Sequence, residues 1–196
     1  MSHSPSEPTS ASRPVFTTKR LTVRAWTVED APTLFDIYGR WDVARWLGAT
    51  PRALESLDEA EQLARGWAER SHPGDPYGIW CITVTGSSTP VGTVLLVPIP
   101  GAVGGEVEVG WHLHPDHWGN GYATEAARAA IARGLAVGLE EVLAVVSPEN
   151  AASLAVCRRL GLHSRGRSEA YYGRPLEVFS TRPHADEPRA RRPRRR

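Results

Sequence analysis

Cysteine, lysine and long apolar runs are all scarce in this sequence, and these shortages exclude several classes of protein. Of its 196 residues two are cysteines, Cys81 and Cys157, which excludes a disulfide framework and favours a reducing compartment. No apolar run is long enough to cross a membrane as a helix, and residues 1–14 lack the apolar stretch of a signal peptide. One lysine stands against 22 arginines, a bias that we attribute to genome composition. We therefore expect a cytoplasmic protein with no membrane contact.

Charge is distributed unevenly along the chain. Residues 182–196 hold seven arginines and two acids, a net of +5, so that the overall net charge of +1 leaves −4 for the other residues. Such a tail attracts phosphate, which predicts a weak contact with RNA or the ribosome; a solvated tail without a dedicated partner is the alternative. The composition predicts disordered tails over 1–14 and 182–196, which leaves 15–181 as a single domain.

Between the tails, hydrophobic periodicity predicts alternating strands and helices. Segments 27–30 and 56–59 resemble capping boxes, and each precedes an apolar stripe at helical spacing. A Gly-Ser-Ser turn at 86–88 predicts an antiparallel hairpin, and the crossover within 106–147 predicts a parallel pair. Strands are expected at 21–26, 77–85, 91–97, 106–113, 141–147, 162–167 and 176–181, and helices at 31–38, 60–67, 121–137 and 150–160. The predicted fold class is α/β (α+β), with a mixed, mostly antiparallel central sheet of about 6–7 strands and helices on both faces.

A glycine-rich segment, Trp118-Gly119-Asn120-Gly121-Tyr122-Ala123, joins a predicted strand to a predicted helix. A helix N-terminus offers unpaired N–H groups and a partial positive charge, and glycines let the backbone approach an anion closely. The segment lacks the lysine of a P-loop and the third glycine of a dinucleotide fingerprint. It is compatible with an anion site and with a plain tight turn.

A second group of polar residues opens the last predicted helix. Asn150, Ser153 and Cys157 are spaced so that they share one helix face. Asn150 is either a plain N-cap or an amide offered outward. Cys157 is either a small core residue or a catalytic group.

Taken together, these motifs resemble the GNAT superfamily of N-acetyltransferases, and within it the Rim type that includes ribosomal-protein N-terminal acetyltransferases. The resemblance rests on the glycine loop, on Asn150-x-x-Ser153 and on Leu160-Gly161-Leu162, with support from 18–24 and 109–113, and it covers about 15–181. It implies acetyl-CoA as co-substrate, no metal, and an amine acceptor that is either a protein N-terminus or a small molecule. The acetyl group would move by direct attack in a ternary complex.

The resemblance also implies where acetyl-CoA would bind. The backbone of Trp111, His112 and Leu113 would pair with the pantetheine arm. Asn150 would bond the pantetheine, and Ser153 would lie close to it. The pyrophosphate would be held by the amides of Gly119, Asn120, Gly121, Tyr122, Ala123 and Thr124.

Three positions depart from the family pattern. Trp118 stands where the loop often begins with Gln or Arg, Cys157 where many members carry a tyrosine acid, and Val145 where some carry a glutamate base. These departures leave open the alternative of a catalytically weak CoA-binding sensor or scaffold. A monomer and a homodimer are both compatible with the sequence.

Acetyl transfer requires a neutral amine, so a base has to remove a proton. Glu108 is the candidate base, and Glu106 and His112 share its strand face as alternatives. The thiolate that leaves needs a proton, for which Ser153, Cys157, water and the pair Tyr171-Tyr172 are candidates.

We expect the acceptor to enter beside the segment that holds Trp41, Arg45, Trp46 and Leu47, although both tryptophans are also candidates for core anchors. No acidic cluster occurs there, which does not favour a polycationic acceptor.

Overall fold

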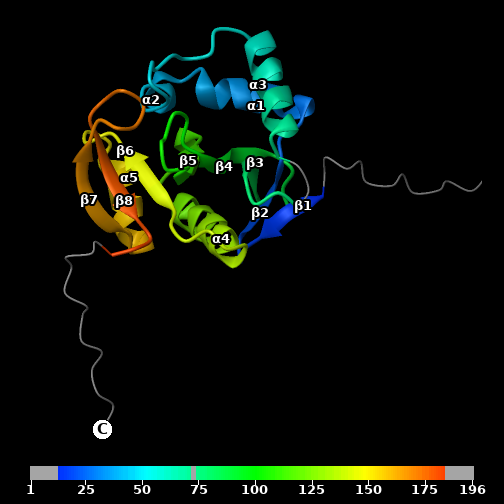
Figure 1. Cartoon of the computed structure of the whole chain (residues 1–196). Helices are drawn as coiled ribbons and strands as arrows, with labels where there is room; N and C mark the ends of the chain where they lie inside the picture. The colour runs from blue at the N-terminus through cyan, green and yellow to red at the C-terminus, as the bar shows by residue number, and fades with distance from the viewer. Residues whose placement is uncertain (1–12, 72–73, 184–196) are drawn as a thin grey trace, which may run out of the picture.

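One mixed sheet of eight strands runs through residues 13–71 and 74–183, which are the residues that this computed structural model describes (Figure 1). The strand order is β1-β2-β3-β4-β5-β6-β8-β7, and every neighbouring pair is antiparallel except β5 and β6, which are parallel. The strands are β1 (Pro14–Thr17), β2 (Leu21–Ala25), β3 (Gly78–Val84), β4 (Pro90–Pro98), β5 (Val107–Leu113), β6 (Leu143–Val146), β7 (His163–Ser168) and β8 (Leu176–Ser180).

Helices cover both faces of this sheet. α1 and α3 lie on one face and α4 on the other (Figure 1). Within the described ranges, no helix is both long and apolar enough to cross a membrane. The helices are α1 (Ala31–Tyr38), α2 (Trp41–Ala44), α3 (Leu57–Glu69), α4 (Tyr122–Ala136) and α5 (Ala151–Leu160), with short 3-10 turns η2 (Val28–Asp30) and η3 (Pro115–His117).

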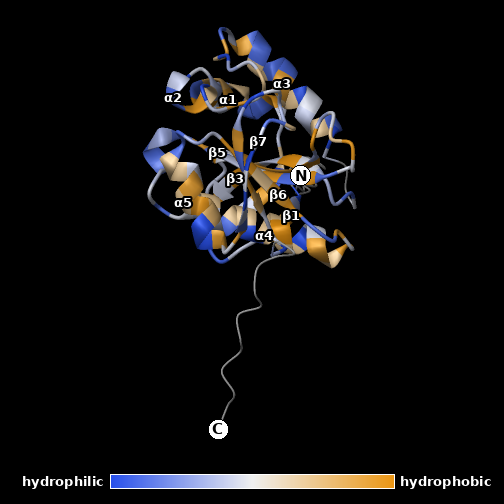
Figure 2. Ribbon diagram, turned by 60° about the vertical axis from the view of Figure 1, so that its left-hand side comes forward, coloured by the Kyte–Doolittle hydropathy of each residue, from blue (hydrophilic) through white to orange (hydrophobic). Residues whose placement is uncertain are grey.

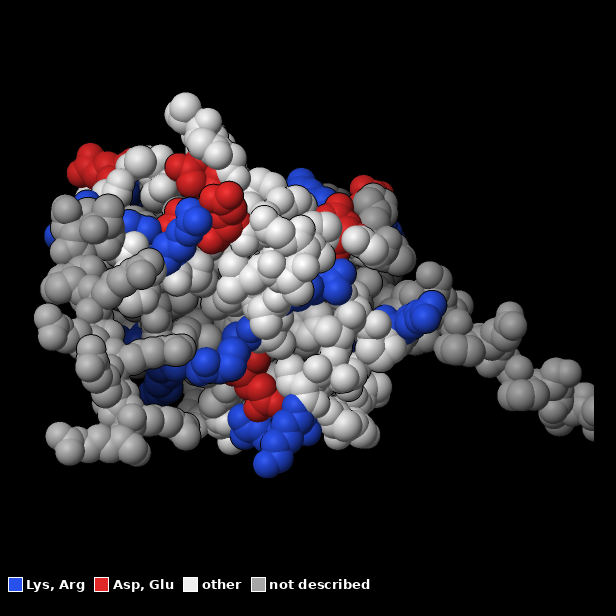
Figure 3. All heavy atoms as spheres, turned by 60° about the horizontal axis from the view of Figure 1, so that its bottom comes forward, with Lys and Arg blue, Asp and Glu red and all other residues white. Residues whose placement is uncertain are grey.

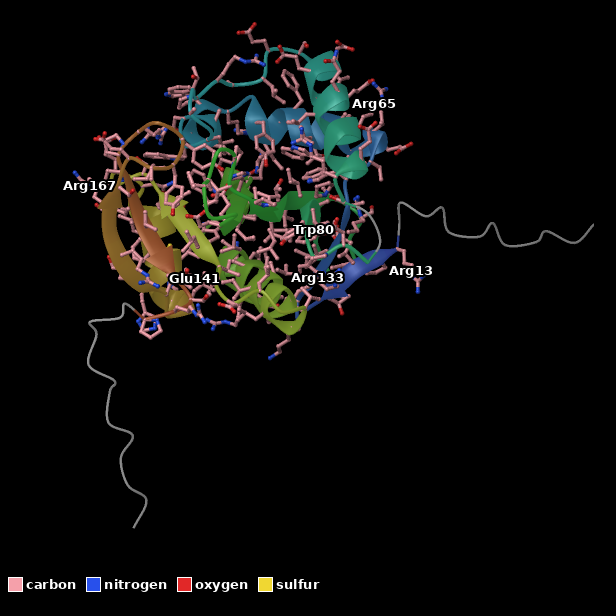
Figure 4. The ribbon with its side chains drawn as sticks, in the orientation of Figure 1. Arg13, Arg65, Trp80, Arg133, Glu141 and Arg167 are labelled. Atoms are coloured by element: carbon pink, nitrogen blue, oxygen red, sulfur yellow. The ribbon has the colours of Figure 1, made fainter. Side chains whose placement is uncertain are left out.

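The two faces of β3 separate two hydrophobic cores. Trp80 and Ile82 belong to the core beneath α4, whereas Cys81 belongs to the core beneath α1 and α3, as the alternation of side chains along a strand requires. Trp80 points into the interior of the molecule (Figure 4). Along the outer helices α3 and α5, hydrophilic and hydrophobic residues alternate (Figure 2), so each helix buries one face and exposes the other.

The predicted fold class is confirmed, with two additions. The sheet has eight strands instead of six or seven, because β1 begins at Pro14, the last residue of the predicted N-terminal tail. Phe16 holds this strand to the core by packing its ring edge-on against Trp80, with ring centroids 5.7 Å apart. The short helix α2 was also not predicted. The remaining residues of both predicted tails, apart from Arg13, Arg182 and Pro183, lie outside the described residues.

Polar side chains define where several helices begin and end. Asp30 accepts a hydrogen bond from the backbone nitrogen of Thr27 at 3.0 Å and forms a buried ion pair with Arg24, with N–O distances of 2.6 and 2.8 Å. Ser56 caps α3 by accepting from the backbone nitrogen of Glu59 at 3.2 Å. Gly161 ends α5 in the left-handed conformation, at φ 75°, which is common for a glycine that follows a helix.

Segments far apart in sequence are tied together around the sheet. Arg133 of α4 donates to the carbonyl oxygen of Asp75, which precedes β3, at 2.9 Å. Glu141, just before β6, accepts from Arg165 of β7 at 2.7 Å. Both side chains can be followed in Figure 4. These contacts hold α4 and the segment before β6 in place. Through these two parts the chain crosses from β5 to β6.

The parallel pair β5–β6 is the weakest junction of the sheet. β4 and β5 are paired continuously from Gly92–Leu113 to Pro98–Val107, but β5 and β6 share a single register pair, Glu108–Leu143. Beyond Glu108 the two strands diverge, so the outer edge of β5 is left without a strand partner over its last residues. This divergence creates the space in which the candidate site lies.

Glycine is required where β4 passes β5 most closely. A Cβ atom on Gly92 would lie 2.3 Å from the carbonyl oxygen of His112 and 2.4 Å from Cδ2 of Leu113. We therefore expect Gly92→Ala to lower the free energy of unfolding by about 1–3 kcal/mol, because the extra methyl group overpacks the strand pair. Urea denaturation measures this change.

Gly66 provides the matched control, because it lies in α3 and a Cβ atom there would meet nothing within 4 Å. Gly66→Ala should raise the free energy of unfolding by about 0.5–1 kcal/mol, since alanine favours a helix interior. An unchanged urea midpoint for Gly92→Ala would contradict the close strand approach.

Candidate active site

A cavity of about 910 Å³ opens where β5 and β6 diverge. Its walls are β5, the glycine loop with the first turn of α4, the end of β6, the start of α5, the segment after α2 and the loop between β7 and β8. The structure brings together at this cavity most of the predicted site residues: Glu108, Trp111, His112, Leu113, Gly119, Gly121, Tyr122, Ala123, Thr124, Asn150 and Ser153. Asn120 and Cys157 do not line it.

The glycine loop forms one end of the cavity. Gly119 and Gly121 have φ angles of 77° and 78°, in the left-handed region that other residues rarely adopt. α4 begins directly after them at Tyr122, so its unpaired N–H groups and the positive end of its dipole face this region. The loop is therefore a suitable site for an anion.

The side chain of Thr124 supports the anion site more specifically. Its Oγ1 atom is buried and has no hydrogen-bond partner within the described part of the chain, although Thr124 lines the cavity. A buried hydroxyl without a partner costs free energy. A phosphate oxygen bound in the loop would supply the missing acceptor, so the residues present fit a pyrophosphate.

Arg20 and Glu125, which were not predicted as site residues, hold the loop in place. Arg20 donates to the carbonyl oxygen of Asn120 at 3.0 Å and to Glu125 at 2.7 Å, and Glu125 also accepts from the hydroxyl of Thr18 at 2.6 Å. Arg20 lies in a segment that supported the family resemblance and Glu125 follows the glycine loop, but the sequence did not indicate that they contact each other across the fold.

The tryptophan that opens the loop has a structural role. The indole nitrogen of Trp118 donates to the carbonyl oxygen of Leu113 at 2.9 Å and so fastens the loop to the end of β5. The side chain of Asn120 donates to the carbonyl oxygen of His117 at 3.2 Å. Asn120 thus shapes the loop through its side chain, and its predicted backbone contact with the pyrophosphate stays a prediction.

Asn150 fits both interpretations of its role. Its Oδ1 atom accepts from the backbone nitrogen of Ser153 at 3.0 Å and caps α5. Its Nδ2 atom has no hydrogen bond to any described residue, and both Asn150 and Ser153 line the cavity. The N-cap bond therefore orients the side chain and leaves its N–H donors for a ligand.

Glu108 combines burial with access to the cavity. Its side chain comes from the last residue that β5 shares with β6, and 8 % of the residue is exposed. Burial raises the pKa of Glu108 to about 7, and a short hydrogen bond donated by the Tyr172 hydroxyl opposes this shift only in part. Near neutral pH the carboxyl group is therefore poised to accept a proton.

The two alternative bases are less well placed. Burial lowers the pKa of His112 to about 4, and its Nδ1 atom lies 2.9 Å from the hydroxyl of Tyr38, which donates to Thr93 at 2.7 Å. The ring is thus a neutral and weak base. Glu106 does not line the cavity, and it accepts from the backbone nitrogen of Gly104 at 2.9 Å.

Cys157 lies in the hydrophobic core beneath α4 and has no exposed surface. Burial raises the pKa of its thiol to about 12. Because the thiol is separated from the cavity, we leave Cys157 out of the proposed catalytic groups. The spacing predicted that Cys157 shares a face with Asn150 and Ser153, but only those two line the cavity, and Cys157 lies in the core.

The opposite end of the cavity is formed by the segment after α2. Arg45 lies over the ring of Trp46, with 4.2 Å between its guanidinium carbon and the ring centroid, and both line the cavity. Trp46 is half-buried and Trp41 is 56 % exposed, so neither is a fully buried core anchor. Arg174, from the loop between β7 and β8, donates to the carbonyl oxygen of Gly48 at 3.3 Å and closes this end.

On the face that Figure 3 presents, positive and negative side chains are interspersed. Over residues 13–71 and 74–183, no group of three or more His, Cys, Asp or Glu side chains is arranged to hold a metal ion.

Comparison with known proteins gives the same family as the motifs. Residues 20–163 match the family described as the acetyltransferase (GNAT) domain. The chain is 28 % identical over 160 residues to a Bacillus subtilis (strain 168) protein named as the uncharacterized N-acetyltransferase YoaA, covering 81 % of this chain and 88 % of that protein.

Solved structures share the fold. One is RimL, a ribosomal L7/L12 alpha-N-protein acetyltransferase in complex with coenzyme A, with a TM-score of 0.70 at 18 % identity, covering 89 % of this chain and 100 % of that one. Another is the ribosomal-protein-S5-alanine acetyltransferase from Vibrio fischeri, with a TM-score of 0.66 at 20 % identity, covering 88 % and 98 %. The chain therefore belongs to the GNAT family of acetyltransferases, enzymes that take their acetyl group from acetyl-CoA.

Proposed function

We propose that this enzyme transfers the acetyl group to a primary amine by direct attack in a ternary complex, with Glu108 as the general base. The observation that carries the proposal is the place of Glu108. It is a buried carboxyl group with a pKa near 7, and it lines the cavity that contains both the glycine loop and the open end beside α2. A base in that place meets the acceptor between the two ends.

The donor end binds and orients acetyl-CoA. The amides of residues 119–124 hold its pyrophosphate at the N-terminus of α4, and the free edge of β5 at Trp111–Leu113 pairs with the pantetheine arm in the manner of a strand. Asn150 donates from its amide to the same arm. Bound in this way, acetyl-CoA supplies a thioester carbonyl carbon that an amine can attack.

The protein's own groups then move the protons. The amine has to lose a proton as its nitrogen attacks, and Glu108 accepts that proton. An N–H group at the end of β5, for which Leu113 is the candidate, stabilises the negative charge that develops on the carbonyl oxygen. Of the predicted proton donors, Ser153 and Tyr172 line the cavity, and the Tyr172 hydroxyl donates to Glu108. Ser153, together with water, therefore returns a proton to the thiolate.

The acceptor is best sought among protein N-termini and among amines that carry no further positive charge or that also carry an acidic group. Arg45 and Arg174 line the acceptor end, and within the described residues neither forms an ion pair. Two unpaired cations repel a polycationic acceptor. Because solved proteins of this fold include acetyltransferases named for ribosomal-protein α-amines, peptide N-termini are the first acceptors to screen.

The variant Glu108→Gln tests the base. We expect turnover to fall by about 100-fold or more, because amide nitrogen cannot accept the proton, while the affinity for coenzyme A stays unchanged. In the wild type, kcat/KM should fall as the pH drops below about 7, because the base is active only when deprotonated. A thiol-trapping dye measures the turnover and its pH dependence, and calorimetric titration measures the affinity for coenzyme A.

Two outcomes would contradict this proposal in different ways. Full activity of Glu108→Gln would remove Glu108 from catalysis. Tight binding of coenzyme A without turnover over a panel of peptides and amines would favour the sensor or scaffold alternative.

The variant Thr124→Val tests the donor end. The affinity for coenzyme A should fall about tenfold, the usual loss for one hydrogen bond to a charged group. The free energy of unfolding should not fall, because the hydroxyl has no hydrogen-bond partner among the described residues. Calorimetric titration and thermal unfolding measure the two quantities.

Thr83→Val is the matched control, because the Thr83 hydroxyl donates to the carbonyl oxygen of Thr22 at 3.3 Å and does not line the cavity. It should lose stability and keep its affinity. Equal affinities for Thr124→Val and the wild type would argue against a phosphate contact at Thr124.

A further inference from the structure

The loop between β7 and β8 is held by three side-chain hydrogen bonds, two of which involve residues that line the cavity. Tyr171 donates to Glu106 at 3.5 Å, and Tyr172 donates to Glu108 through a short hydrogen bond. Arg174 donates to the carbonyl oxygen of Gly48 at 3.3 Å. The loop thus joins β5, a strand of the sheet, to the segment after α2, which lies outside the sheet.

Tyr172 has an unusual backbone conformation within this loop. Its φ angle is 57°, and in the described ranges it is the one residue other than glycine with a positive φ. This conformation is costly for a bulky side chain and persists only where the surroundings enforce it. Here the half-buried ring lines the cavity and the hydroxyl contacts Glu108, so the strained backbone aims the side chain at the proposed base.

The geometry points to Tyr172 as a positioning residue for Glu108, an inference that rests on the proposed function. The hydroxyl donates to Oε1 of the carboxylate, which fixes its rotamer and leaves Oε2 to accept the proton of the acceptor amine. Burial and the neighbouring carboxylate raise the pKa of Tyr172. The hydroxyl therefore stays neutral and is a donor to Glu108.

This arrangement separates two roles that the sequence left open for the tyrosine pair. A hydroxyl that donates its hydrogen bond to Glu108 is not free to protonate the thiolate. Tyr171 contacts Glu106 outside the cavity, so it is remote from the reacting groups. Neither tyrosine is then the acid, and Tyr172 acts through the base.

Removing the Tyr172 hydroxyl should change how Glu108 titrates. The hydrogen bond favours the charged carboxylate and lowers the pKa of Glu108 against the effect of burial. Without it burial acts unopposed, and the pKa rises further. The other titratable or charged groups that line the same cavity are Asp42, Arg45, His112, Tyr122, Arg159 and Arg174.

The experiment compares pH profiles of kcat/KM for the full-length enzyme. For Tyr172→Phe, which keeps the ring, we expect the acid limb to move to higher pH by about one unit. Activity at pH 7 should fall about 5–10-fold and recover in alkaline buffer, with the KM for acetyl-CoA unchanged. Thermal unfolding checks that the variant is folded.

Tyr171→Phe is the matched control, because it removes a hydroxyl from the same loop without touching Glu108. Its acid limb should stay in place. The double variant Glu108→Gln/Tyr172→Phe should be no slower than Glu108→Gln alone, since a residue that acts through the base adds nothing once the base is gone.

Failure of the inference can be distinguished from failure of the proposed function. If Glu108→Gln retains activity, the proposed base is wrong. If Glu108→Gln is inactive but the acid limb of Tyr172→Phe matches that of the wild type, Glu108 remains the base and the role of Tyr172 is overturned. A shift of equal size in Tyr171→Phe would also overturn it.

Discussion

The divergence of β5 from β6 after a single shared register pair is the constraint on which the rest of the site depends. β5 is firmly paired with β4 on its other side, so the strand keeps its shape while its outer edge is open beyond Glu108. An extended ligand can use the exposed backbone groups there as a neighbouring strand would. The same divergence opens the cavity, and Glu108 lies in its lining.

Polar groups that are buried at this cavity differ from those elsewhere in the fold. The buried pair Arg24–Asp30 is fully compensated by mutual hydrogen bonds. Thr124, in contrast, carries a buried hydroxyl without a hydrogen-bond partner in the described ranges. Burial raises the pKa of Glu108, and one hydrogen bond reduces this shift. Of the three such unpartnered atoms, only that of Thr124 lines the cavity. An unpaired buried polar group is tolerated where a ligand completes it, and under the proposed function the pyrophosphate of acetyl-CoA would do so for Thr124.

The sequence predicted what local patterns encode and missed what depends on distance along the chain. Strand alternation, the place of the glycine loop between a strand and a helix, and the cap at Ser56 are local, and the structure confirms them. β1 was missed because four residues beginning with proline carry too little pattern. The contact of Arg20 with Glu125 spans 105 residues and that of Tyr172 with Glu108 spans 64, so neither leaves a local signature. Spacing alone also could not show that Cys157 faces the core.

The two ends of the cavity are built by different means, and this difference limits what the fold alone can specify. Backbone geometry defines the donor end, through the left-handed glycines, the start of α4 and the edge of β5. Side chains define the acceptor end, on the segment after α2 and on the loop that Arg174 ties to it. Backbone geometry persists through many substitutions, whereas loop side chains change freely. Proteins that share the donor and the fold can therefore differ in acceptor, and under the proposed function Arg45, Trp46, Tyr172 and Arg174, instead of the sheet, would select the acceptor of this enzyme.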